Sequence, residues 1–125
     1  MNNTVFGNVV FNTGWKTNID VTIFGQTHNI VVKAKAYTEK DTITRPQEAS
    51  YKTFLDNKNQ LQTKIESLLN DFSNGKAKIR FTPSMLEFNR DGAYALLLHD
   101  TQEPDNGIAV CLAPNVEVMT QDDYL

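Results

Sequence analysis

The feature that most constrains the fold is a change in the spacing of apolar residues along the chain. From residue 15 to residue 37 apolar and polar side chains alternate, which is the pattern of a β-strand with one solvated face. From residue 44 to residue 75 the apolar spacing becomes three and four, the pattern of an amphipathic helix. Alternation returns after residue 77. The sequence therefore predicts one helical region between two runs of strands.

Three strands are predicted before the helix. Residues 5–11 are rich in β-branched and aromatic side chains and end at the turn Asn12-Thr13-Gly14. Residues 15–23 and 27–37 follow, separated by a turn at Gly25-Gln26. Since one side of each later strand is polar, we expect an antiparallel meander with one solvated face.

The helix is predicted to begin at Thr44-Arg45-Pro46-Gln47. This stretch supplies an N-cap hydroxyl, a proline in the first turn and an amide that reaches back to the cap nitrogen. Gly75 is a suitable C-cap. Asn57-Lys58-Asn59 has low helix propensity, so the segment is either one long helix or two shorter helices with a kink. An apolar stripe, interrupted only by Lys58, is expected to pack on the sheet: Tyr51, Phe54, Leu61, Ile65, Leu68 and Phe72.

Further strands are predicted after the helix. Residues 77–82 alternate and lead to Pro83, which marks a sheet edge or a break. Residues 85–88 and 93–98 form a hairpin around Asp91-Gly92, and residues 108–112 and 116–119 add two strands. We therefore predict an α+β fold, a mainly antiparallel sheet of about six to seven strands with one long or kinked helix packed on one face. The core is expected to contain Trp15, Ile19, Val21, Ile30, Val32, Phe54, Leu61, Ile65, Leu68 and Phe72.

Length and composition bound the class of protein. A chain of 125 residues with 40% hydrophobic residues suits one domain with one core, so we expect residues 1–125 to form a single domain. No stretch is apolar enough to span a bilayer, and the N-terminus lacks the pattern of a secretory signal. A lone Cys111 agrees with a reducing compartment. These features predict a cytoplasmic protein with no membrane partner.

The charge distribution is uneven. All twelve Lys and Arg residues lie at or before Arg90, whereas residues 91–125 contain seven acids. This asymmetry argues against nucleic acid at the C-terminal surface and permits a basic protein or a cation there. The alternative is that the strands and loops near this end are acidic without a partner. The candidate binding residues are Asp100, Glu103, Asp105, Asp122 and Asp123.

The segment HDTQEPDNG, from His99 to Gly107, has two interpretations. Its carboxylates suit a hard metal ion, but the ligand spacing of a calcium-binding helical loop is absent. Pro104-Asp105-Asn106-Gly107 instead has the residues of a β-turn, and we predict a solvated turn without a metal. The glycines are scattered singly and Cys111 lies in an apolar strand, so we expect no nucleotide loop, no catalytic thiol and no cofactor.

Several short motifs carry a resemblance that spans nearly the whole chain. They are Phe6-Gly7 with Gly14-Trp15, the helix start from Gln47 to Phe54, Thr82-Pro83, Asp105-Asn106-Gly107-Ile108 and the terminal Gln121-Asp122-Asp123-Tyr124-Leu125. With these motifs the chain resembles a family of short bacterial proteins classed as a domain of unknown function. The resemblance implies a bacterial cytoplasmic origin and company with small proteins proposed to act as toxin antidotes. It implies no catalytic residues.

Two classes of function follow from the sequence. The first is a non-enzymatic protein-binding module, of the immunity or regulatory type, whose acidic C-terminal surface meets a basic partner. The alternative is a small hydrolase or metal-dependent enzyme that uses Asp100, Asp105, Asp122 or Asp123 with His99. The alternative requires these side chains to converge in one concave pocket.

Overall fold

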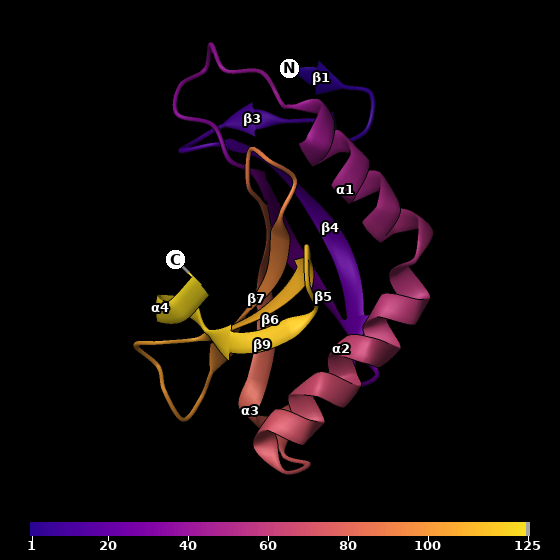
Figure 1. The fold of residues 1–125 in the computed structure, drawn as a ribbon, viewed down its shortest axis with the longest axis vertical. Helices are drawn as coiled ribbons and strands as arrows, with labels where there is room; N and C mark the ends of the chain where they lie inside the picture. Colours follow the sequence, from indigo (N-terminus) through magenta and orange to yellow (C-terminus); the bar gives the residue numbers. More distant parts are fainter. Residues whose placement is uncertain (125) are drawn as a thin grey trace.

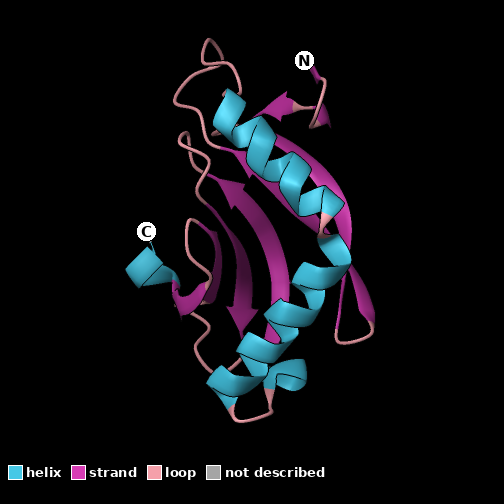
Figure 2. Ribbon diagram, turned by 45° about the vertical axis from the view of Figure 1, so that its right-hand side comes forward, coloured by secondary structure: helices cyan, strands magenta, loops and turns pink. Residues whose placement is uncertain are grey.

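The computed structural model describes residues 1–124, and it has the predicted α+β architecture (Figures 1 and 2). The main sheet has seven strands in the order β3-β4-β5-β6-β7-β8-β9, and helices cross one of its faces. Within it β5 and β6 pair in parallel, because the helical segment joins them, and the other neighbours pair antiparallel. The elements are β1 (Asn2–Asn3), β2 (Gly7–Asn8), β3 (Val10–Phe11), β4 (Trp15–Ile23), β5 (Gln26–Ala34), α1 (Arg45–Asp56), α2 (Lys58–Ser73), α3 (Ala77–Arg80), β6 (Phe81–Phe88), β7 (Tyr94–Asp100), β8 (Ile108–Ala113), β9 (Glu117–Thr120) and α4 (Gln121–Tyr124).

The hairpin of β4 and β5 follows the predicted alternation. Its register runs without a break from Trp15 opposite Ala34 to Ile23 opposite Gln26. Phe24 and Gly25 turn the chain with φ values of 50° and 76°, the positive values that a tight two-residue hairpin requires. Two positions before β4, Thr13 also has a positive φ, 58°.

The prediction of one strand over residues 5–11 is wrong. The segment is divided between β2 and β3, and β1 pairs with β2 in a separate two-stranded sheet. The side-chain oxygen of Asn3 accepts hydrogen bonds from the backbone N–H groups of Val5 and Phe6 at 2.8 and 2.9 Å. Such a local turn competes with strand pairing for the same donors, and alternation of apolar residues does not reveal it.

The helix begins as predicted and has the kink that the sequence left open. Thr44 caps α1: its hydroxyl accepts from Gln47 N, and the Gln47 side chain accepts from Thr44 N at 2.9 Å. The fully buried Gln47 amide also donates to two backbone carbonyls, those of Lys35 and Phe88. At Asn57 the chain leaves helical geometry, so α1 and α2 are separate helices at an angle (Figure 2).

The buried face of α2 departs from the predicted stripe toward the C-terminal end of this helix. Phe54 and Ile65 are buried as predicted, but beyond Ile65 the buried face runs through Leu69 and not through Phe72. Phe72 is 44% exposed, so its assignment to the core is wrong. Ile19, Leu61 and Leu68 are partly buried against the core, whereas Trp15, Val21, Ile30 and Val32 are buried in it.

The strand predicted for residues 77–82 is also wrong in its first half. Residues 77–80 form the short helix α3, and β6 begins at Phe81. An alternation of only three apolar residues does not separate a strand from a helical turn in which Ala77 is buried and Ile79 is exposed. Pro83 lies inside β6 at an irregularity in its pairing with β7, where a missing N–H is tolerated.

The two faces of the sheet are covered differently. The helices cover the face that carries most of the core, including Leu86, Phe88 and Leu98. On the opposite face Ala95, Leu97 and Ala109 form a small second cluster, together with the partly buried Met85, Met119 and Tyr124. The C-terminal segment thus supplies part of the cover for this second face. Among the described helices, none has the length and apolar composition needed to cross a membrane.

Candidate functional site

Within the HDTQEPDNG segment, residues 101–105 form an exposed connection between two strands, as predicted. His99 and Asp100 end β7, and residues 101–107 lead to β8 through two successive turns. The N–H of Glu103 donates to the Asp100 carbonyl at 3.2 Å, and the N–H of Asn106 donates to the Glu103 carbonyl at 3.0 Å. Glu103 and Asp105 are exposed on this loop.

The C-terminal helix α4 is fastened to the same loop. The backbone N–H of Gln121 donates to the Gly107 carbonyl at 2.9 Å, and its side-chain amide donates to Leu98 O at 3.0 Å and Ile108 O at 3.3 Å. A Cβ at Gly107 would collide with the Leu98 carbonyl and the Gln121 amide. Glycine at this position therefore leaves the room in which Gln121 docks.

A second bond and an apolar anchor complete the attachment of α4. The N–H of Asp122 donates to the side-chain oxygen of Asn106 at 3.2 Å. Tyr124 packs its ring against the second-face cluster, and burial raises the pKa of its hydroxyl to about 12. The phenol is therefore neutral at physiological pH.

These attachments bring four exposed carboxylates to the β9 end of the main sheet. Figure 1 shows α4 beside the β7–β8 loop, although the two segments are separated in sequence by all of β8 and β9. We call this surface the acidic end and define it by Glu103, Asp105, Asp122 and Asp123. Because Gln121 and Asn106 connect its two halves, the carboxylates are presented from a folded framework.

Asp100 does not belong to this exposed surface, and the expectation that it is exposed is wrong. It is 3% exposed, and its two carboxylate oxygens accept from Arg80 Nε at 2.8 Å and Nη2 at 2.9 Å. Oδ1 also accepts from the N–H of Gln102 at 3.0 Å. The hydrogen bond from Arg80 is the main cause that lowers the pKa of Asp100, and it outweighs burial, which acts in the opposite direction.

Arg80 organises the base of the acidic end. Its guanidinium carbon lies 5.0 Å from the centre of the Phe81 ring and 5.9 Å from that of Phe72, both within range of a cation–π contact. The N–H of Thr101 donates to the Arg80 carbonyl at 2.9 Å. The hydrogen bond to Asp100 raises the pKa of Arg80, and the charge of Glu103 adds to this effect. Phe72, which is not part of the core, therefore packs its ring against the Arg80 guanidinium.

The structure separates His99 from Asp100, one of the four carboxylates that the enzyme alternative combines with this histidine. His99 is exposed, whereas the neighbouring Asp100 is buried, so the two side chains lie on opposite sides of β7. Asp100 is already paired with Arg80. Within residues 1–124, no group of three His, Cys, Asp or Glu side chains is arranged to hold a metal ion. Cys111 is buried, and burial raises the pKa of its thiol, which disfavours the nucleophilic thiolate.

Sequence reasoning missed the residues that hold the acidic end together. Arg80 lies in a segment predicted as a strand, and the role of Gln121 depends on a four-residue helix for which the sequence has no strong signal. Gly107 was a usable clue, because a glycine beside the turn also permits close approach by another segment.

No known protein-family model, curated protein or solved structure matches the chain.

Proposed function

We propose that the chain is a non-enzymatic protein-binding module whose acidic end recognises a basic protein. The observation that carries the proposal is the convergence of exposed acids from two distant segments, Glu103 and Asp105 on one and Asp122 and Asp123 on the other. The chain has no Lys or Arg after Arg90, and Arg80 is engaged by Asp100. The acidic end therefore combines a single sign of charge with a fixed framework.

Electrostatic complementarity would act mainly on the rate of encounter and on the choice of partner. Charges at the rim of an interface attract an oppositely charged partner over a distance and repel a partner of like charge, while they add little to the lifetime of the complex. Such selection of one basic partner suits an immunity-type or regulatory protein. We place this activity in the cytoplasm of a bacterial cell, in line with the resemblance to short bacterial proteins.

The test compares two variants of equal net charge. In the first, the acidic end is neutralised with Glu103→Gln, Asp105→Asn, Asp122→Asn and Asp123→Asn, and Asp100 is left intact. The matched control neutralises four acids that are exposed elsewhere on the fold, namely Asp20, Glu39, Asp56 and Asp71. Each protein is immobilised and used to capture partners from a lysate of the native host, and association rates are then measured with the recovered partner at two salt concentrations.

The proposal makes a directional prediction for both variants. The variant neutralised at the acidic end should associate about tenfold more slowly at low salt and should lose most of its salt dependence, because screening acts on the long-range attraction. The control variant should bind with nearly the rate of the wild type. If both variants slow association equally, net charge alone accounts for the effect and the acidic end has no special role.

A further inference from the structure

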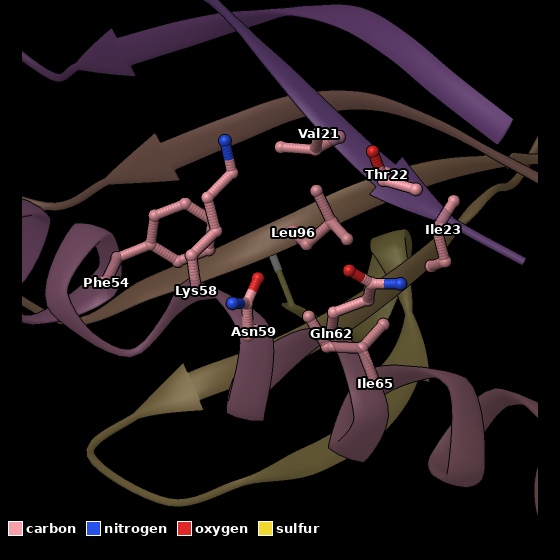
Figure 3. Close-up of a pocket in the computed structure, with 9 residues that line it drawn as sticks. All are labelled: Val21, Thr22, Ile23, Phe54, Lys58, Asn59, Gln62, Ile65 and Leu96. Carbon is pink, nitrogen blue, oxygen red and sulfur yellow. The ribbon is translucent and has the colours of Figure 1, made fainter. Parts of the chain in front are cut away.

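A separate cavity lies where the junction of α1 and α2 passes over the sheet (Figure 3). Its volume is about 170 Å³, and it lies between the end of β4, the strand β7 and the first turns of α2. Five side chains form its apolar wall, and each is less than a tenth exposed: Val21, Ile23, Phe54, Ile65 and Leu96. The cavity is independent of the acidic end, with which it shares no lining residue.

The helix break accounts for the position of the cavity. Since α1 ends at Asp56 and α2 starts in a new direction at Lys58, the helical segment does not follow β4 closely at this point. Two polar bridges hold helix and strand on either side. Lys58 Nζ donates to the Asp20 carbonyl at 2.6 Å, and Glu66 Oε2 accepts from Phe24 N at 2.7 Å.

The rim of the cavity carries polar groups from α2. Figure 3 shows Lys58 beside Phe54, and Asn59 and Gln62 on the α2 side of Leu96. The Gln62 amide nitrogen donates to Glu66 Oε2 at 3.2 Å, which orients its side chain along the rim. Lys58 forms one hydrogen bond, to Asp20 O, from a group with three N–H donors. The site thus joins an apolar wall to a mouth with hydrogen-bonding capacity.

From this geometry we propose that the cavity binds a monocyclic aromatic molecule with one hydrogen-bonding substituent. Small-molecule sites are concave and mostly apolar, with a few polar groups that fix the orientation of the ligand, and this pocket combines these two kinds of lining. An enclosed apolar cavity of about 150 Å³ engineered in another protein binds benzene, so a volume of about 170 Å³ is large enough for one aromatic ring. The ring would contact Phe54, Ile65 and Leu96, and the substituent would face Asn59 and Lys58.

Phenol is the probe for the first experiment. It is titrated into the isotope-labelled protein while the backbone amide resonances are followed. We expect saturable shifts confined to residues 21–23, 54–65 and 96, with a dissociation constant on the order of 1 mM or lower for a ligand of this size. Shifts that never saturate, or that spread evenly over the protein, would overturn the proposal.

Variants then test which part of the cavity holds the probe. Val21→Phe should fill the wall and abolish saturable binding, provided that its amide spectrum remains that of the folded protein. Asn59→Ala should weaken phenol binding several-fold but leave toluene binding unchanged, because it removes a polar group at the rim. The matched control Gln60→Ala changes an exposed neighbour on α2 that does not line the cavity, and it should leave both affinities unchanged.

The rim variants keep the test decisive even if Val21→Phe fails to fold. Equal affinities of wild type and Asn59→Ala for phenol would refute the role of the rim. Equal losses in Asn59→Ala and Gln60→Ala would show that the effect is not specific to the site. Binding of phenol by a folded Val21→Phe protein would place the ligand elsewhere and would overturn the assignment of the cavity.

Discussion

The ion pair between Arg80 and Asp100 leads to a specific stability prediction. Asp100 is buried and paired, whereas Glu103 and Asp105, which follow it in the chain, are exposed. Asp100→Asn keeps the size of the side chain but leaves the Arg80 guanidinium without its counter-charge. The Arg80 side chain is only 20% exposed, and that of Asp100 is 1% exposed. Removing one member of a buried pair typically costs 3–5 kcal/mol, and partial access of water to Arg80 favours the lower end.

We therefore expect Asp100→Asn to lower the free energy of unfolding by about 3 kcal/mol at pH 7. For a domain of this length the corresponding fall in Tm is about 10 °C. Urea denaturation followed by circular dichroism measures the first quantity, and a thermal melt measures the second. Asp105→Asn is the matched control, since it makes the same substitution at an exposed position of the connection and should leave stability unchanged.

The pH dependence gives a second readout of the same pair. The folded-state pKa of Asp100 lies below its ordinary value of 3.8, so the stability it contributes is fully present above that value and is lost as the pH falls through the folded pKa. The difference between wild type and Asp100→Asn should be constant near neutral pH and should shrink below about pH 4. If the difference does not change with pH, or if Asp105→Asn is equally destabilised, the assignment of Asp100 as the buried partner of Arg80 is refuted.

Three further substitutions have expected outcomes that equilibrium unfolding can measure. Ile65→Ala should cost about 2–5 kcal/mol, because it truncates a buried side chain that packs between helix and sheet. Thr44→Ala should cost about 1 kcal/mol by removing the acceptor for Gln47 N at the start of α1, and a cost near zero would argue against the cap. Gly107→Ala should destabilise the chain and release α4, seen as faster amide exchange at Gln121, because the added methyl occupies the space of that side chain.

The sequence was sufficient for the parts of the fold that depend on local patterns. The strand over residues 15–23 and the capping box at Thr44 follow from side-chain alternation and from the spacing of a hydroxyl and an amide, and both are confirmed. The α+β class follows from the order of these elements. The kink at Asn57 was one of two open alternatives, because low propensity weakens a helix without deciding whether tertiary contacts maintain it.

The errors occur where a short segment has two competing arrangements. Residues 77–80 alternate in polarity, but only the tertiary position of Ala77, buried beside α2, makes them a helical turn. Phe72 continued the predicted stripe, yet the buried positions of α2 follow a spacing of four, from Ile65 to Leu69 and Ser73, and leave Phe72 half exposed.

The candidate surface shows the same division between local and tertiary information. The acidic character of residues 91–125 is visible in the composition, but a list of charges does not separate exposed from buried acids. Asp100 ends strand β7 and Asp105 lies in the exposed connection that follows, and nothing in the local sequence shows that Asp100 pairs with Arg80, which lies twenty residues earlier. An experiment designed from the sequence alone would neutralise all five acids together. Because Asp100 pairs with Arg80, that experiment would mix a loss of stability with a loss of recognition. Because the structure assigns Asp100 to the framework and the other four to the exposed surface, charge and fold can be perturbed separately. Slower association in a fully stable variant would then report recognition alone.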